Sequence, residues 1–489
     1  MRGLFVFCAL LILCLAGCNE KELNDPLAFK MTEQSAKNDF LVFKNILQSA
    51  HPSLSLYKSD QRIRFLFDSI DASLSGSISL KKFYSDLYFL CDEIGCSHTD
   101  VYLPDHIYDT LQNRKFFFPY PVLWVENKLL VNALGYDLPQ GSEVISINGT
   151  PVEQVLNTLL SYNSVEGFHR QTQVDLAAKD FSFEYYLNFG PQELFLLKIK
   201  DTLGITKTIT ENSITYGEWN DRNSYDKYYF DGVDVDYDLS INNEKGYAVM
   251  KLPTFEFTGY QKQTAFENFC VNSFDLLEKK KNIHKLIIDL RENGGGRLYG
   301  AFLLFSYLTK NSFAQFEYVS SKIKSLPYQQ YLEEDFAAAS KTDVTETLRD
   351  DFIKNKNGSY YYADSLNTKW EPAAHRFAGQ IFVITNAATV SAASYFALLV
   401  KKTGIGKVVG VETAGGSFSG NGFKNLAYTL PASHIKLMFP YAHIVYSHKE
   451  IKNTGRGVLP DYNVPDTYES FKNNNDKQLL YILDSLNLN

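Results

Sequence analysis

The sequence predicts a multidomain α/β protein, and three blocks of different periodicity support this prediction. Residues 30–100 carry apolar side chains at helical spacing, residues 115–210 consist of short runs rich in β-formers, and residues 240–465 alternate strands with helices. A chain of 489 residues has room for about three domains.

The composition is that of a packed globular protein. Hydrophobic residues make up 45% and charged residues 21% of the chain, which excludes a disordered, collagenous or disulfide-scaffold protein. The net charge is −8 and the sequence has no basic tract, and both observations argue against a nucleic-acid partner. The cysteine spacing fits no zinc pattern, and nothing in the sequence indicates a metal or another cofactor.

The N-terminus has the pattern of a signal peptide. Arg2 precedes an apolar run, Leu4–Gly17, that is too short to span a bilayer. Its end, Leu15-Ala16-Gly17-Cys18, resembles the bacterial lipobox, in which the peptide is cut before a cysteine that then carries lipid. We therefore expect residues 1–17 to be removed and Cys18 to anchor the protein to a membrane of the cell envelope. An ordinary signal peptide with a chance cysteine is the alternative.

The next block, residues 18–114, is predicted to be a polar tether followed by a helical domain. A first helix carries Phe40, Phe43 and Ile46 on one face and ends before Pro52, and two more amphipathic segments follow at 63–74 and 80–91.

Residues 115–215 are predicted to form a β-rich domain. Two short strands, 122–125 and 128–131, precede a segment in which the pair Asn148-Gly149 is a strong hairpin signal, followed by a helix over 152–162. This order resembles a PDZ-like domain, a class that captures extended peptides by adding a strand. A small β-domain without a peptide groove is the alternative, because no clear glycine-rich carboxylate-binding loop is present.

Residues 216–489 are predicted to form an α/β core. Strands are expected at 247–252, 285–290, 380–385 and 407–411, with helices at 263–280 and 391–402. Such alternation places functional sites at the carboxyl ends of the strands. A longer and more polar insert, residues 297–377, is expected to act as a lid or a partner surface.

Ser391 is the first candidate for chemistry. It lies between a predicted strand and a predicted helix, among small alanines, where backbone N–H groups at the helix start favour an oxyanion. A plain helix cap is the alternative, and Ser394 lies one turn further along. Two further segments could join it. Residues 289–296 end in three glycines after a buried strand, and residues 95–99 place Ser97 beside His98.

Together these segments resemble the C-terminal processing (tail-specific) serine peptidases over residues 30–465. The resemblance rests on Asp289-Leu-Arg-Glu-Asn-Gly-Gly-Gly296, the Ser391 segment, Val409-Gly-Val-Glu-Thr-Ala-Gly-Gly416 and Arg456-Gly-Val-Leu-Pro-Asp461, with His51-Pro-Ser53 near the start. It implies a peptidase core of the crotonase/ClpP-like α/β type beside a PDZ-like domain. It also implies a serine endopeptidase that acts on exported proteins or peptides without a cofactor. Because the family includes relatives that bind ligands without proteolysis, a peptide- or lipid-binding surface lipoprotein is the alternative.

One departure from the family decides which base is expected. The Ser/Lys members carry a lysine 25 residues after the nucleophile, and here that position is a glycine. Lys401 and Lys402 lie too far along the helix, and no family pattern supports Lys407.

The Ser97-His98 pair instead resembles the tricorn-type branch, which uses a Ser-His-Ser-Glu tetrad. The resemblance then implies Ser391 as nucleophile, His98 as base, and Ser97 with a glutamate as orienting groups. Glu450 is the expected glutamate and Glu412 the second choice.

The expected oxyanion donors are the backbone N–H groups of Gly295 (or Gly294) and Ala392. Because the expected base is a histidine, which must be neutral to accept a proton, we expect activity to rise through about pH 6–7. The sequence leaves the cleavage preference and the oligomeric state open.

Overall fold

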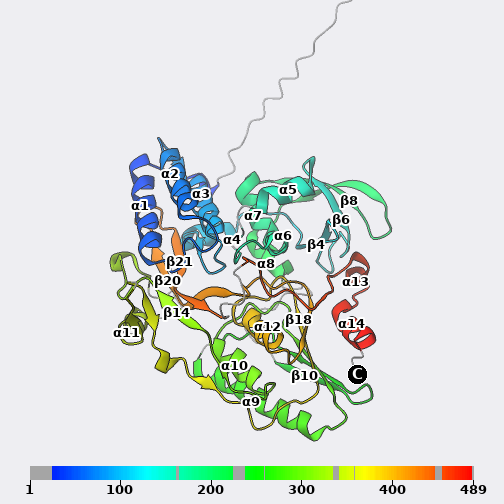
Figure 1. Ribbon diagram of the computed structural model, residues 1–489. Helices are drawn as coiled ribbons and strands as arrows, with labels where there is room; N and C mark the ends of the chain where they lie inside the picture. The colour runs from blue at the N-terminus through cyan, green and yellow to red at the C-terminus, as the bar shows by residue number, and fades with distance from the viewer. Residues whose placement is uncertain are drawn as a thin grey trace, which may run out of the picture.

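The structure is a computed structural model (Figure 1), and it describes residues 25–486 apart from 161–162, 164, 224–236, 258, 334–340, 357 and 447–453. The expected signal peptide and Cys18 lie outside the described residues. Within the described ranges, no helix has the length and apolar character needed to cross a membrane.

The helical block is present as expected from its periodicity. It contains α1 (Glu33–Ala50), α2 (Asp60–Ser73), α3 (Leu80–Ile94) and α4 (Asp105–Gln112), with the short strands β1 (Lys30–Met31), β2 (Ile78–Ser79) and β3 (Asp100–Tyr102). Thr32, Ser59 and Ser79 cap the first three helices by accepting a hydrogen bond from a backbone N–H of the first turn. Helix α3 ends at Gly95, whose φ of 71° turns the chain into the loop that carries Ser97 and His98.

The second block is an antiparallel sheet with its own apolar core. Its strand order is β4-β5-β6-β8-β9, and β7 pairs with β6. Asn148 and Gly149 both have positive φ, as the expected hairpin turn requires. Three helices, α5, α6 and α7, pack on this core, and the last two were not expected from the sequence. The elements are β4 (Val122–Val125), β5 (Lys128–Val131), β6 (Glu143–Ile147), β7 (Thr150–Pro151), α5 (Val152–Leu159), α6 (Arg170–Lys179), α7 (Phe181–Phe189), β8 (Leu194–Lys200) and β9 (Thr206–Asn212).

The third block is built on a six-stranded sheet of order β10-β11-β12-β18-β19-β22, parallel except for β10. Helices α9, α10 and α12 share a core with one face, and α14 packs on the other. The elements are α8 (Tyr216–Asn223), β10 (Asp238–Asn242), β11 (Tyr247–Lys251), α9 (Gly259–Lys279), β12 (Lys285–Asp289), α10 (Leu298–Ser306), β18 (Gln380–Thr385), α12 (Ser391–Thr403), β19 (Lys407–Gly410), β22 (Tyr462–Asn463), α13 (Tyr468–Lys472) and α14 (Lys477–Ser485).

Much of the 297–377 segment belongs to the body of the fold, which its polar character did not predict. Its first helix, α10, is largely buried against α12. Three of its strands belong to an antiparallel sheet of order β15-β16-β14-β21-β20, and β3 of the helical block joins this sheet by pairing with β21. The elements are β13 (Phe313–Ala314), β14 (Tyr318–Ser321), α11 (Lys341–Asp350), β15 (Phe352–Lys354), β16 (Tyr360–Tyr362), β17 (Lys369–Trp370), β20 (Ser419–Thr429) and β21 (Lys436–Val445).

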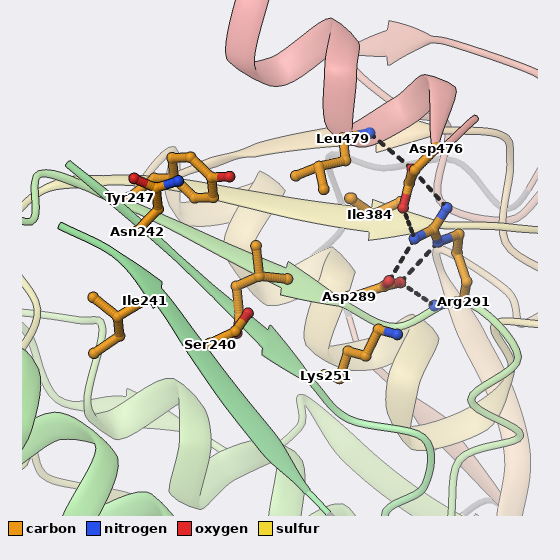
Figure 2. Close-up of a pocket in the computed structure, with 11 residues that line it drawn as sticks. Ser240, Ile241, Asn242, Tyr247, Lys251, Asp289, Arg291, Ile384, Asp476 and Leu479 are labelled. Carbon is orange, nitrogen blue, oxygen red and sulfur yellow. Dashed lines mark hydrogen bonds and ion pairs between the residues drawn. The ribbon is translucent and has the colours of Figure 1, made fainter. Parts of the chain in front are cut away.

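The end of β12 is tied to the start of α14 by Arg291. Its guanidinium binds Asp289 at 2.6 Å and Asp476 at 2.7 Å, beside a cavity of about 390 Å³ between β10, β11 and α14 (Figure 2). Val249 and Ile384 line this cavity, and their side chains belong to the sheet face opposite α12. Within the Asp289–Gly296 segment, Asp289 and Arg291 therefore stabilise the fold.

Candidate active site

Ser391 is the first residue of α12 and follows the end of β18, as the sequence predicts. Its φ is 53°, a conformation that is costly for a residue with a side chain and is typical of functional turns. Two glycines make room for this turn. A Cβ added at Gly295 would lie 2.6 Å from the Ser391 Cβ, and one added at Gly415 would lie 2.9 Å from the Ser391 nitrogen.

Ser394, the other candidate nucleophile, has a structural role. Its side chain is buried, and its hydroxyl donates to the Thr389 carbonyl at 2.8 Å while accepting from the Gly415 N–H at 3.1 Å. This hydroxyl fastens the turn after β18 to the start of α12, so of the two serines Ser391 is the better placed to react.

His98 is the side chain placed to act as a base for Ser391. Its Nε2 lies 3.3 Å from the Ser391 Oγ, and its Nδ1 lies 3.2 Å from the Ser97 Oγ. Desolvation in the site lowers the pKa of His98 to about 4. The imidazole is therefore neutral at pH 7, the state in which it can accept a proton.

The structure brings an unexpected glutamate, Glu166, to Ser97. Its Oε2 accepts from both the N–H and the hydroxyl of Ser97 at 3.3 Å, and its Oε1 accepts from the Tyr57 hydroxyl at 2.8 Å. The side chain is 1% exposed, and burial raises the pKa of Glu166 to about 7. The adjacent Gly167 donates its N–H to the Gly95 carbonyl at 2.9 Å, which fixes this loop beside the end of α3.

Of the two expected glutamates, only Glu412 is among the described residues, and it is not at this position. Glu450 lies outside the described residues. Glu412 instead accepts from the Arg456 side chain and from the Gly457 N–H at 2.7 Å, with His169 Nε2 at 3.6 Å. Glu412 therefore holds the 456–461 segment in place.

The three lysines considered from the sequence have structural partners near the C-terminal end of the chain, and none of these partners is Ser391. Lys401 donates to the Leu459 carbonyl at 2.6 Å, Lys402 donates to the Tyr446 carbonyl at 3.3 Å, and Lys407 lies 3.8 Å from Asp461.

The two glycines expected to form the oxyanion hole differ in their contacts. The Gly295 N–H donates to Oδ1 of the buried Asn293 at 2.9 Å, whereas no atom lies within 4 Å of a Cβ added at Gly294. Ala392 is in the first turn of α12, where backbone N–H groups have no intrahelical acceptor. The glycine turn is fixed to the serine turn because the Val390 N–H donates to the Asn293 carbonyl at 3.0 Å.

Nothing local in the sequence marks Glu166 as a site residue. It lies 69 residues from Ser97, in a connection between α5 and α6 within the block expected to bind peptide. Only the docking of this connection against Gly95 brings the carboxylate to the histidine.

Comparison with known proteins agrees with the resemblance drawn from the motifs. Residues 246–464 match the model of Peptidase family S41. A search of curated proteins returns no match. Mature CPAF complexed with lactacystin is similar in structure, with a TM-score of 0.63 and 17% identity over 92% of this chain and 99% of that one. Another structure of mature CPAF aligns with a TM-score of 0.60 and 16% identity, over 92% of this chain and 98% of that one.

The photosystem II D1 C-terminal processing protease aligns with a TM-score of 0.42 and 12% identity, over 89% of this chain and 94% of that one. The CPAF alignments show that the fold is shared over most of the chain. The family model matched over residues 246–464 shows that the α/β core is a Peptidase family S41 domain, and the protein is a serine-type peptidase.

Proposed function

We propose that this protein is an endopeptidase that hydrolyses exported proteins or peptides through an acyl-enzyme on Ser391. The observation that carries the proposal is the unbroken series of contacts from Ser391 through His98 and Ser97 to Glu166. A peptidase needs a hydroxyl, a neutral base and a group that orients the base, and these side chains supply all three.

The direction of each hydrogen bond follows from the chemistry of Glu166. Above its pKa of about 7 the Glu166 carboxylate is ionised and only accepts, so in that state Ser97 donates its hydroxyl proton to Glu166. The Ser97 oxygen then accepts the Nδ1–H of His98, and this tautomer leaves Nε2 free to accept a proton. Glu166 and Ser97 thus fix the ring in the state that the reaction requires.

The reaction then follows the acyl-enzyme route. His98 Nε2 takes the proton of Ser391 as its Oγ attacks the scissile carbonyl. The oxyanion is stabilised by the Ala392 N–H and by an N–H of Gly294 or Gly295. His98 returns the proton to the leaving amine, and a water activated by the same ring releases the acyl group from Ser391.

Two further features of the sequence complete the proposal. Cys18 is proposed to carry lipid and to hold the protein on a membrane of the cell envelope. The sheet of β4 to β9 is proposed to be PDZ-like and to bind extended substrate, and the six-stranded core is proposed to be of the crotonase/ClpP-like type.

The competing interpretation, a lipoprotein that binds peptide or lipid without cleaving it, gives no role to the contact between His98 and Ser391. Hydrolysis of a quenched fluorescent casein by the wild type and by Ser391→Ala separates the two. The proposal requires turnover by the wild type alone. Equal turnover, or none in the wild type with tight peptide binding, would contradict it.

A further inference from the structure

We propose that Cys96, His98 and Glu166, on the Ser97 side of the active site, also form a binding site for one thiophilic transition-metal ion of the Zn²⁺ class. Binding of this ion switches the peptidase off. The inference concerns regulation of the site described above, and its inhibitory half rests on the proposed function.

The geometry of three donor atoms supports this site. The Cys96 sulfur, a ring nitrogen of His98 and a carboxylate oxygen of Glu166 all lie within 4.8 Å of one another. Thiolate, imidazole and carboxylate are the ligands that Zn²⁺ takes in proteins, at about 2.0–2.3 Å. Ligand atoms of a tetrahedral ion are separated by about 3.5 Å at those bond lengths, so a movement of about 1 Å brings the three onto one ion.

The nitrogen on the metal side of the ring is Nδ1. The Ser97 Oγ lies 3.2 Å from Nδ1 and 3.3 Å from Glu166 Oε2, whereas Nε2 faces Ser391. An ion bound to Nδ1 would therefore replace the Ser97 hydroxyl as the bridge between His98 and Glu166.

This placement explains how the ion would inhibit. A neutral imidazole carries one N–H, so a metal on Nδ1 leaves the proton on Nε2. His98 then donates toward Ser391 and cannot accept the proton of its hydroxyl. On binding, the Cys96 thiol gives its proton to solvent and a metal–sulfur bond forms, with no change in oxidation state.

The surroundings of the three residues support ligation. Cys96 and Glu166 are each 1% exposed, while His98 is half-buried, so an ion would enter from the side of His98. Asn421 Nδ2 donates to the Cys96 sulfur at 3.2 Å, and Ser53 donates to Asn421 Oδ1 at 2.6 Å. Tyr57 donates to the second oxygen of Glu166. Such outer hydrogen bonds orient ligands and stabilise their anionic forms.

The binding test uses the full chain carrying Ser391→Ala, which prevents self-cleavage, and Co²⁺ as a spectroscopic probe of a Zn²⁺ site. We expect one equivalent of Co²⁺ to produce a thiolate-to-metal absorption band that Zn²⁺ abolishes. Cys96→Ser should remove the band, while Cys270→Ser, which alters a buried thiol of α9 outside the cluster, should keep it. Glu166→Gln should keep the band but weaken Co²⁺ binding at least about ten-fold. Absence of the band, or its survival in Cys96→Ser, would overturn the site.

The inhibition test compares Zn²⁺ titrations of protease activity, each normalised to the same variant's rate in EDTA. The wild type and Cys270→Ser should be inhibited alike and recover with EDTA, whereas Cys96→Ser should need at least about ten-fold more Zn²⁺. Equal sensitivity of Cys96→Ser would overturn the inhibitory role. If no variant hydrolyses casein but the Cys96-dependent band is present, the proposed peptidase function fails and the metal site stands.

Discussion

The hydroxyl of Ser391 lies 3.3 Å from Nε2 of His98, although 293 residues separate the two in the chain. Ser391 belongs to the α/β core, and His98 follows α3 of the helical block. One link between the blocks is β3, which pairs with β21 directly after the histidine loop, with Val101 opposite Leu437. The reactive pair therefore exists only when the helical block is docked on the core.

Glu166→Gln should lower kcat/KM by about 10²-fold or more without unfolding the protein. The amide can donate to Ser97, which favours the wrong tautomer of His98 and leaves Nε2 protonated. Glu412→Gln is the matched control, because Glu412 pairs with Arg456 rather than with Ser97, and it should stay within a few-fold of the wild type. Steady-state kinetics with circular dichroism checks both, and a stronger loss in Glu412→Gln than in Glu166→Gln would reject the role of Glu166.

Gly295→Ala should reduce kcat by about 10²-fold or more, because the new methyl would meet the Ser391 Cβ and move the nucleophile and its oxyanion donors. Gly404→Ala provides the control. Gly404 also has a positive φ, of 68°, but faces open space, so this change should cost about 1–2 kcal/mol of stability and leave kcat nearly unchanged. Similar kcat values for the two variants would show that the Gly295 contact does not matter.

The buried His51 should make the protein less stable in acid. Burial, helped by Lys322 and His443, lowers the pKa of His51 to about 3, while its Nε2 lies 2.9 Å from the Thr99 hydroxyl. Because the unfolded chain binds the proton at higher pH than the folded protein does, the stability from this group is full above pH 6.5 and is lost as the pH falls. The loss is about 2 kcal/mol by pH 5.

Urea unfolding at pH 7 and pH 5 tests this expectation. His51→Gln should lose less stability than the wild type over that interval, while the exposed His106→Gln should behave as the wild type does. An unchanged pH dependence in His51→Gln would mean that His51 titrates normally in the folded state.

Cys18→Ala should release the protein from membranes or stall its processing, because the expected lipid site is lost. The change is measured by detergent phase partitioning of the protein extracted from cells. Cys270→Ala is the control for loss of a cysteine. A Cys18→Ala protein that partitions with the membrane as before would contradict lipid anchoring.

The Ser391 turn and the Ser97-His98 pair could be predicted from the sequence, because each is marked by a pattern of neighbouring residues. A strand, small residues and a serine before an apolar helix predict the Ser391 turn, and adjacent Ser97 and His98 follow a helix whose Gly95 ends it. Glu166 was not predictable, because its position depends on the docking of one block against another.

The pKa of His98 was not predictable for the same reason. Activity rising near about pH 6–7 is the expectation for an exposed imidazole, whereas the surroundings that lower this pKa to about 4 come from distant segments. The helices α6 and α7 were missed because their apolar residues face more than one neighbour and leave no single apolar stripe.

The position of a covalent adduct tests the central claim most directly. A fluorophosphonate probe should label the wild-type protein once, and peptide mass spectrometry should place the adduct on Ser391. Ser391→Ala should lose labelling and hydrolysis together while remaining folded, because replacing a hydroxyl by hydrogen leaves no large cavity. Ser394→Ala should still be labelled. An adduct on Ser394 or Ser97, or full turnover by Ser391→Ala, would contradict the assignment of the nucleophile.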